Sequence, residues 1–356
     1  MKKWKLLTHR KLQVCTHAVA ALDFCRNRHA NKLSVARAMY DFAMSTSYDN
    51  FQYNCRIGQS VAWSTIYNLL KQLSVQEANM TKERGRDLTN WGVIVLDNVQ
   101  NYLLQQDLRI GRVHTMNIGI AATYVEVEGV DPKAHDLDDK LWRIRTSACK
   151  DLTTQDLLGF LDQTHLDTVF SLHWLLVLAR YIPELAHIKS HVSTSFRTRA
   201  AKQRLPSKAN KVHPLATSGK NETVTTELRD ALEDFMEQVG QTADDYQRKV
   251  MPVSGDGMTF EKIHQAKKYL QYHDDDFESH RTTLPSLCLW HTVWTDVSRI
   301  CETHWGETLS HDPSTLGHSA TRIGRSPPPS LKKVDYYPFS ELIYLILDVR
   351  MLDCWR

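Results

Sequence analysis

Two aspartates follow apolar, strand-like runs, and their positions suit metal-dependent chemistry. Asp97 comes directly after the run Gly92–Leu96, and Asp256 follows the short run Lys249–Ser254 after a single glycine. Each carboxylate is therefore expected at the carboxyl end of a strand, where α/β sheets commonly bind ligands. Two converging carboxylates repel each other, and Mg²⁺ is a cation that prefers oxygen ligands. The pattern predicts that Asp97 and Asp256 bind Mg²⁺ and act on a phosphodiester. The alternative is that Asp97-Asn98 and Gly255-Asp256-Gly257 only form turns.

The elements that would position these residues change in character along the chain. Residues 11–85 carry apolar side chains at helical spacing, which predicts a helical N-terminal region. A second strand-like stretch, Ile118–Val127, follows the first, and residues 137–186 return to helical periodicity. Helices are also expected over 221–238, 259–272 and 290–305, with a final one from Phe339. This order predicts an α/β fold class.

The order of these elements resembles the ribonuclease-H-like fold of DDE-type transposases. The resemblance divides the chain into a helical region over residues 1–88 and a ribonuclease-H-like core over 89–356. A helical insertion interrupts this core at about residues 130–220. In that fold a third catalytic carboxylate comes from a later helix, which points to Asp348 here, with Asp296 and Glu302 as competing candidates.

Several motifs in a fixed order also carry a family resemblance. They are Trp91–Gln100, Gly255–Lys262, Leu289–His291, Asp312–His318 and the terminal Leu347–Arg356. Together they resemble a large basidiomycete fungal family with a domain of unknown function, over about residues 90–356. The resemblance implies an origin in transposable elements and carries no established activity.

The segment Asp49–Leu73 has the layout of a helix-turn-helix, with Ile57–Ser60 as the turn. That interpretation directs several side chains toward a DNA major groove and Lys71 toward a phosphate. The groove-facing residues would be Gln59, Ser60, Trp63, Ser64 and Asn68. The alternative is a plain helical hairpin in which Trp63 anchors a core.

Residues 185–221 contain no Asp or Glu and are rich in Lys and Arg. Such a stretch is typical of an exposed linker, a nuclear-import signal or a phosphate-binding arm. We favour the linker, exposed and without regular structure, and name the residues that would contact nucleic acid in the third case. They are Arg197, Arg199, Lys202, Arg204, Lys208 and Lys211.

Composition excludes several other classes of protein. The net charge of +3 is too small to indicate nucleic-acid binding by itself. Seven cysteines without a Cys-x-x-Cys pair argue against a disulfide framework and favour an intracellular protein. The chain has no apolar run long enough to span a membrane. P-loop, Gly-x-Ser-x-Gly and Gly-x-Gly-x-x-Gly motifs are absent from the sequence, which disfavours nucleotide and serine hydrolysis.

These features lead to a hypothesis and its rival. The first is a transposase-like, metal-dependent DNA-processing protein, active or inactive, located in the nucleus. The rival is a non-catalytic module that binds nucleic acid or another protein. The last predicted helix stays apolar up to Trp355 without a capping residue, so we also expect that the chain is a fragment of a longer protein. Docking of Trp355 into the core is the alternative.

Overall fold

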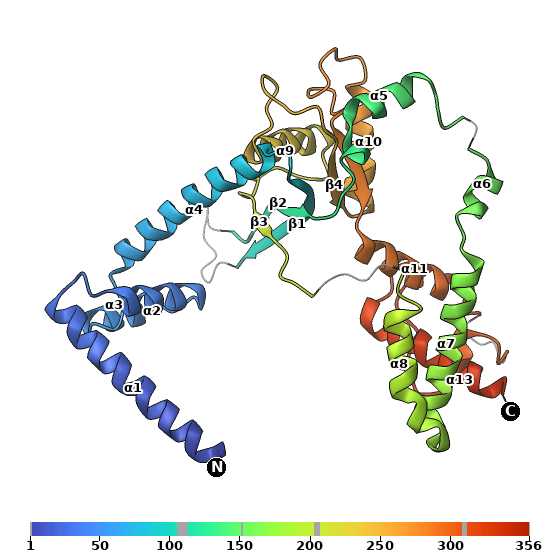
Figure 1. Cartoon of the computed structure of the whole chain (residues 1–356), viewed down its shortest axis with the longest axis horizontal. Helices are drawn as coiled ribbons and strands as arrows, with labels where there is room; N and C mark the ends of the chain where they lie inside the picture. The colour runs from blue at the N-terminus through green and yellow to red at the C-terminus, as the bar shows by residue number, and fades with distance from the viewer. Residues whose placement is uncertain (1, 105–112, 151, 203–206, 308–311, 356) are drawn as a thin grey trace. The chain divides into compact units, whose positions relative to one another are not determined.

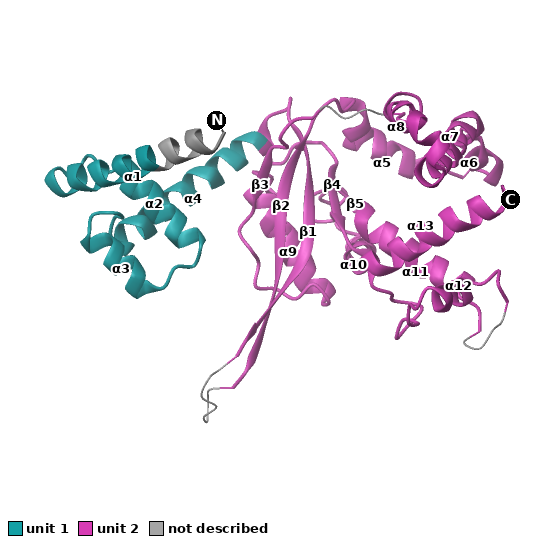
Figure 2. Ribbon diagram, turned by 90° about the horizontal axis from the view of Figure 1, so that it is seen from below, with its two compact units in different colours: residues 1–84 teal, residues 85–356 magenta. Residues whose placement is uncertain are grey.

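The chain divides into two compact units, which are described separately. A computed structural model describes residues 2–104, 113–150, 152–202, 207–307 and 312–355 (Figure 1). The first unit is Met1–Arg84 and the second is Gly85–Arg356 (Figure 2). In the described residues no helix is both long and apolar enough to cross a membrane.

All the regular secondary structure described in the first unit is helical. It contains α1 (Lys2–Arg26), α2 (Lys32–Ala43), α3 (Tyr48–Arg56) and α4 (Trp63–Arg86), whose last two residues belong to the second unit. Its small core buries Ala38 of α2, Phe51 of α3, Ile66 of α4 and Val61 of the loop before α4. Leu69 and Leu70 pack beside them at helical spacing from Ile66, so α4 turns one face inward.

The described part of the second unit contains a five-stranded mixed sheet in the order β3-β2-β1-β4-β5. The strands are β1 (Trp91–Leu103), β2 (Thr115–Val127), β3 (Val212–Pro214), β4 (Met251–Gly255) and β5 (Thr283–Leu287). β2 is antiparallel to both β1 and β3, whereas β4 is parallel to β1 and β5 is parallel to β4. A mixed α/β fold with a helical N-terminal region is therefore confirmed.

Helices fill the connections between these strands. Between β2 and β3 lie η1 (Pro132–His135), α5 (Leu137–Arg145), α6 (Thr154–Gly159), α7 (Gln163–Tyr181), η2 (Pro183–Ile188) and α8 (Lys189–Thr198). α9 (Thr225–Gln238) connects β3 to β4, and α10 (Gly257–Tyr269) connects β4 to β5. After β5 come α11 (Leu289–His304), α12 (Leu316–Arg322) and α13 (Tyr336–Asp353). Trp355 beyond α13 is 64% exposed, with its ring 6.3 Å from that of Trp174.

The main core lies between the sheet and helices α9 and α10. Ile94 and Val253, which are register partners on β1 and β4, are fully buried in it. Leu228, Leu232 and Phe235 recur at helical spacing on α9 and turn one face of that helix into the same core. This packing fixes α9 and α10 against the strands that carry the candidate site.

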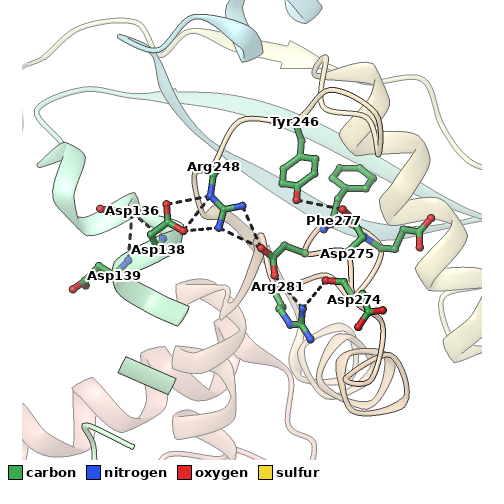
Figure 3. A network of polar contacts seen from close by, with 11 residues as sticks. Asp136, Asp138, Asp139, Tyr246, Arg248, Asp274, Asp275, Phe277 and Arg281 are labelled. Carbon is green, nitrogen blue, oxygen red and sulfur yellow. Dashed lines mark hydrogen bonds and ion pairs between the residues drawn. The ribbon is translucent and has the colours of Figure 1, made fainter. Parts of the chain in front are cut away.

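A polar network holds the entrance to β4, at the end opposite Asp256 (Figure 3). The Arg248 guanidinium donates through Nε to both carboxylate oxygens of Asp138 on α5, at 3.1 Å each. It also donates to Asp276, which in turn accepts from Arg281 at 3.0 Å. Bidentate guanidinium–carboxylate pairs constrain geometry as well as charge. The network therefore ties α5, the start of β4 and the loop before β5 together.

We predict that Phe235→Ala destabilises the second unit by about 3–5 kcal/mol, because the fully buried ring leaves a cavity in the main core. Urea unfolding followed by far-UV circular dichroism measures this change. Phe160→Ala is the matched control, since that ring is 77% exposed, and it should alter the unfolding free energy by less than about 0.5 kcal/mol. Equal effects of the two changes would contradict the description of this core.

Candidate active site

The register of two parallel strands brings the two predicted aspartates level with each other. Ile94 pairs with Val253 and Val95 with Ser254, so two more residues along each strand lead to Asp97 and Asp256. Neighbouring strands are separated by about 4.8 Å. Asp97 does not mark the end of its strand, as the sequence predicted, because β1 continues to Leu103. The paired partner ends instead, since β4 stops at Gly255.

Asp256 also caps a helix, as the turn interpretation of its motif expects. Its Oδ1 accepts a hydrogen bond from the Thr259 backbone N–H at 2.8 Å, which satisfies a free donor in the first turn of α10. The Thr259 hydroxyl lies 3.0 Å from the same oxygen. A Cβ on Gly255 would approach the Thr259 methyl group to 2.6 Å, so the glycine allows this close turn. Capping fixes the carboxylate and leaves Oδ2 outside these contacts.

Glu222 is a third carboxylate at this place, and the sequence did not single it out. It lies in the turn between β3 and α9, is only 2% exposed, and is hydrogen-bonded to the Thr259 hydroxyl. Burial, together with the negative charges of Asp256 and Asp97, raises the pKa of Glu222 to about 7. The structure therefore places Glu222 beside Thr259, which also contacts Asp256, and within the electrostatic reach of Asp97.

The Thr259 hydroxyl contacts two of these acids, Glu222 and Asp256. A hydroxyl has one hydrogen and can donate only once, yet the Thr259 oxygen contacts both Glu222 and Asp256. Both contacts are satisfied if Glu222 is protonated and donates to Thr259, which then donates to Asp256. A raised pKa of Glu222 agrees with this arrangement. In that arrangement the hydrogen bonds run from Glu222 through Thr259 to Asp256.

The donor set suits a hard cation, although the carboxylates are not arranged as a closed cage. Within the ranges that the structure describes, no three His, Cys, Asp or Glu side chains are close enough to hold a metal ion between them. Mg²⁺ often takes only one or two protein carboxylates and keeps several waters. Burial and the two aspartates disfavour the ionised form of Glu222, and an added cation would favour that form. Asp97 and Asp256 are the residues that would hold such an ion.

Comparison with known proteins gives one match. Residues 147–356 match the model of a family of unknown function, DUF6589. The chain belongs to the DUF6589 family. Curated proteins and solved structures gave no match. The matched segment of this DUF6589 protein contains Glu222 and Asp256, whereas Asp97 precedes it.

The structure places the provisional third acid of this DUF6589 protein with other partners. Asp348 on α13 accepts from Arg180 Nη1 at 2.8 Å and from the Tyr181 hydroxyl at 3.0 Å, both on α7. It therefore joins two helices, and it is not among the charges that act on Glu222. Of the two competitors on α11, Asp296 is exposed and Glu302 accepts from Arg299 at 2.7 Å. Glu222, and not Asp348, is the buried acid whose pKa Asp97 and Asp256 help to raise.

The basic stretch, residues 185–221, contains more regular structure than a linker would, and several of its lysines are paired with carboxylates. It contains α8 and β3, so the expectation of a segment without regular structure is wrong there. Lys202 pairs with Asp162 at 2.9 Å, Lys211 with Glu126 at 3.2 Å, and Lys208 with Glu128. Arg197 and Arg199 are exposed at the end of α8, and Arg204 lies outside the described residues. Three of the six predicted nucleic-acid contacts thus already face a carboxylate.

The helix-turn-helix interpretation loses two of its groove-facing residues. Ser60 is fully buried, and the Trp63 ring packs against Phe51 with 5.1 Å between ring centroids. Trp63 therefore anchors the core of the first unit, as the alternative proposed. Gln59, Ser64 and Asn68 remain exposed, and so does Lys71.

We predict that Glu222→Gln changes how stability depends on pH. Glu222 keeps its proton in the folded state up to a pKa of about 7, whereas the unfolded chain releases it near 4.5. The folded state thus binds more protons between these values, and the free energy of unfolding falls as pH rises through this window. The wild type should lose up to about 3 kcal/mol relative to Glu222→Gln from pH 4.5 to 7.

Urea unfolding across pH 4–9 in a chelating buffer, on the order of one point per pH unit, measures this difference. Glu261→Gln is the control, because Glu261 is exposed on α10 and should leave the pH profile unchanged. Parallel profiles for the wild type and Glu222→Gln would show that burial and the two aspartates do not raise the pKa of Glu222.

Proposed function

We propose that this protein is a metal-dependent enzyme that cleaves or transfers phosphodiester bonds in DNA, in the manner of a transposase. One observation carries the proposal. Asp97 on β1 is level with Asp256, which directly follows the adjacent parallel strand β4, and burial together with these two charges raises the pKa of Glu222. A buried carboxyl group with a raised pKa beside other acids is found more often at catalytic sites than at structural ones.

The topology of the sheet supports a ribonuclease-H-like core. The strand order β3-β2-β1-β4-β5, with β2 antiparallel to the other strands, is the order expected of that fold. The helices α9, α10 and α11 follow β3, β4 and β5, as such a core requires. Helices η1 to α8 then constitute an insertion between β2 and β3. Fold alone does not define an activity, so the acid cluster carries the functional argument.

In this proposal the three acids have different roles. Asp97 and Asp256 would hold Mg²⁺, which neutralises their repulsion and polarises a phosphodiester oxygen. The Thr259 N–H already holds the Asp256 side chain in one rotamer. Binding of an ion by Oδ2 would therefore cost little additional rotamer entropy. Glu222 would give up its proton when the cation is present, and its carboxylate would then be available as a base for the attacking water. Thr259 positions Glu222 and Asp256 relative to each other.

The non-catalytic alternative has one observation in its favour. The described residues offer no ready-made group of three metal ligands, as a protein that kept the fold and lost the chemistry would show. Such a protein would bind DNA without cleaving it. DNA as the substrate and the nucleus as the location remain parts of the proposal, since they follow from the resemblance of the sequence motifs.

We predict that the purified protein nicks or cleaves labelled DNA in the presence of Mn²⁺ or Mg²⁺, and that Asp97→Asn and Asp256→Asn each lower the rate by about 100-fold or more. Removing one oxygen ligand weakens the site without changing the shape of the side chain. Gel analysis of single-stranded, duplex and branched DNA measures the rate, and isothermal titration with Mn²⁺ measures binding of the ion.

Asp296→Asn is the matched control, because this exposed α11 carboxylate lies outside the cluster and should keep wild-type activity. Glu222→Gln and Asp348→Asn separate the two candidates for the third acid. Glu222→Gln should inactivate the protein, whereas Asp348→Asn should lower only its stability. DNA binding without cleavage under all these conditions, and without Mn²⁺ binding, would favour the non-catalytic alternative.

A further inference from the structure

The hairpin of β1 and β2 extends well beyond the rest of the sheet as a two-stranded ribbon (Figure 2). β1 and β2 pair continuously from Trp91 with Val127 to Leu103 with Thr115. Pairing with β4 covers only Ile94 and Val95 of β1. The segment Asn98–Leu103 therefore has a partner on one side, β2, and an open edge on the other. An isolated two-stranded ribbon is only marginally stable in water.

The hydrogen bonds of the neighbouring strand show which backbone groups point to this open edge. Ile120 exchanges two backbone hydrogen bonds with Ser218, at 2.8 and 2.9 Å, so its N–H and C=O point away from β1. Its register partner on β1 is Asn98. In an antiparallel pair both members of such a position point outward, and the direction alternates along the strand. The N–H and C=O groups of Asn98, Gln100 and Tyr102 therefore face the open edge.

Side chains that normally protect such an edge are absent from this one. Natural edge strands usually carry Lys, Pro or a bulge that prevents pairing with another chain. The described ribbon, Asn98–Leu103 and Thr115–Ile120, contains no Lys, Arg, Asp, Glu or Pro. It instead exposes large apolar side chains on both strands. They are Val99, Tyr102, Leu103, Met116 and Ile118.

We propose that this edge of β1 pairs with the same edge of a second copy of the chain, antiparallel and about a two-fold axis at Gln100. The three outward-facing residues are spaced symmetrically about Gln100, so Asn98 of one copy would pair with Tyr102 of the other. The same residues then meet across a closed two-fold interface. Absence of charge favours this partner, because a charged side chain near the axis would meet its own copy. DNA is disfavoured as the occupant, since the described ribbon offers no cation to a phosphate.

This pairing fixes the distance between two acid clusters. With Gln100 on the axis, the paired segment is Asn98–Tyr102 of each copy, and Asp97 comes one residue before it. The two Asp97 residues are then six positions apart along the shared strands, or about 20 Å at 3.4 Å per residue. The pairing itself does not depend on the proposed activity, because it uses only backbone groups and uncharged side chains.

Size-exclusion chromatography with light scattering on the full chain, from about 1 to 200 μM, tests the proposal. The wild type should shift from monomer to dimer over this range. Gln100→Lys and Gln100→Glu should each raise the dissociation constant at least about tenfold, because each brings like charges together at the axis. An equimolar mixture of the two variants should restore the dimer, since opposite charges then meet.

Asn117→Lys is the matched control. It adds the same charge to the same ribbon, but on β2, one strand away from the proposed interface, and Asn117 is exposed like Gln100. It should dimerise as the wild type does. A wild type that stays monomeric at about 200 μM, a dimer that Gln100→Lys leaves intact, or a mixture that remains monomeric would each overturn the proposed pairing.

Discussion

The parallel pairing of β1 with β4 is the constraint on which the candidate site depends. Ile94 and Val253 are register partners and are both fully buried, so the main core itself sets this register. A shift by one residue would turn the apolar side chains of β1 out of the core, which makes slippage costly. Because the register is fixed by packing, the positions of Asp97 and Asp256 three residues further on are fixed with it. The site thus takes its geometry from apolar side chains that perform no chemistry.

Burial of Glu222 beside two aspartates makes its ionised form costly in the folded protein. An acid that is 2% exposed beside two aspartates is unfavourable when ionised, and its raised pKa expresses that cost. The Thr259 hydroxyl contacts both Glu222 and Asp256, so a protonated Glu222 can donate a hydrogen bond to Thr259 while Thr259 donates to Asp256. Thr259 can do so only because Gly255 leaves room for its methyl group. Clustered carboxylates of this kind are a feature of sites that bind a cation, because the bound cation removes the repulsion between their negative charges.

The sequence predicted the parts of the fold that have a local signal. Gly92–Leu96 indicated a buried strand because β-branched and apolar residues follow one another there. The outer half of β1 was missed, since Asn98, Gln100 and Asn101 have no core face to generate a pattern. β3 and β5 were missed because they are short and contain Pro214 and Pro285. Both strands form edges of the sheet, where a proline is tolerated. Glu222 left only a weak signal, as the first acid after the stretch 185–221. Its role comes from a tertiary contact with Thr259, and Asp348 looked similar because its apolar neighbours hid a contact with Arg180.

The opening of the acid cluster and the open edge of β1 have one physical origin. β4 ends at Gly255 because Asp256 must turn into the cap of α10, whereas β1 continues to Leu103. If β4 continued beside β1, its backbone would occupy the space that a substrate needs next to Asp97. Its absence exposes the carboxylate and, at the same time, leaves Asn98, Gln100 and Tyr102 without a neighbouring strand. When one strand ends early so that an acid on its neighbour can reach a large substrate, the neighbouring strand is left with an unpaired edge. Proteins usually blunt such edges with charge, and the described part of this ribbon, Asn98–Leu103 and Thr115–Ile120, carries no Lys, Arg, Asp or Glu, which leaves the edge free to pair as proposed.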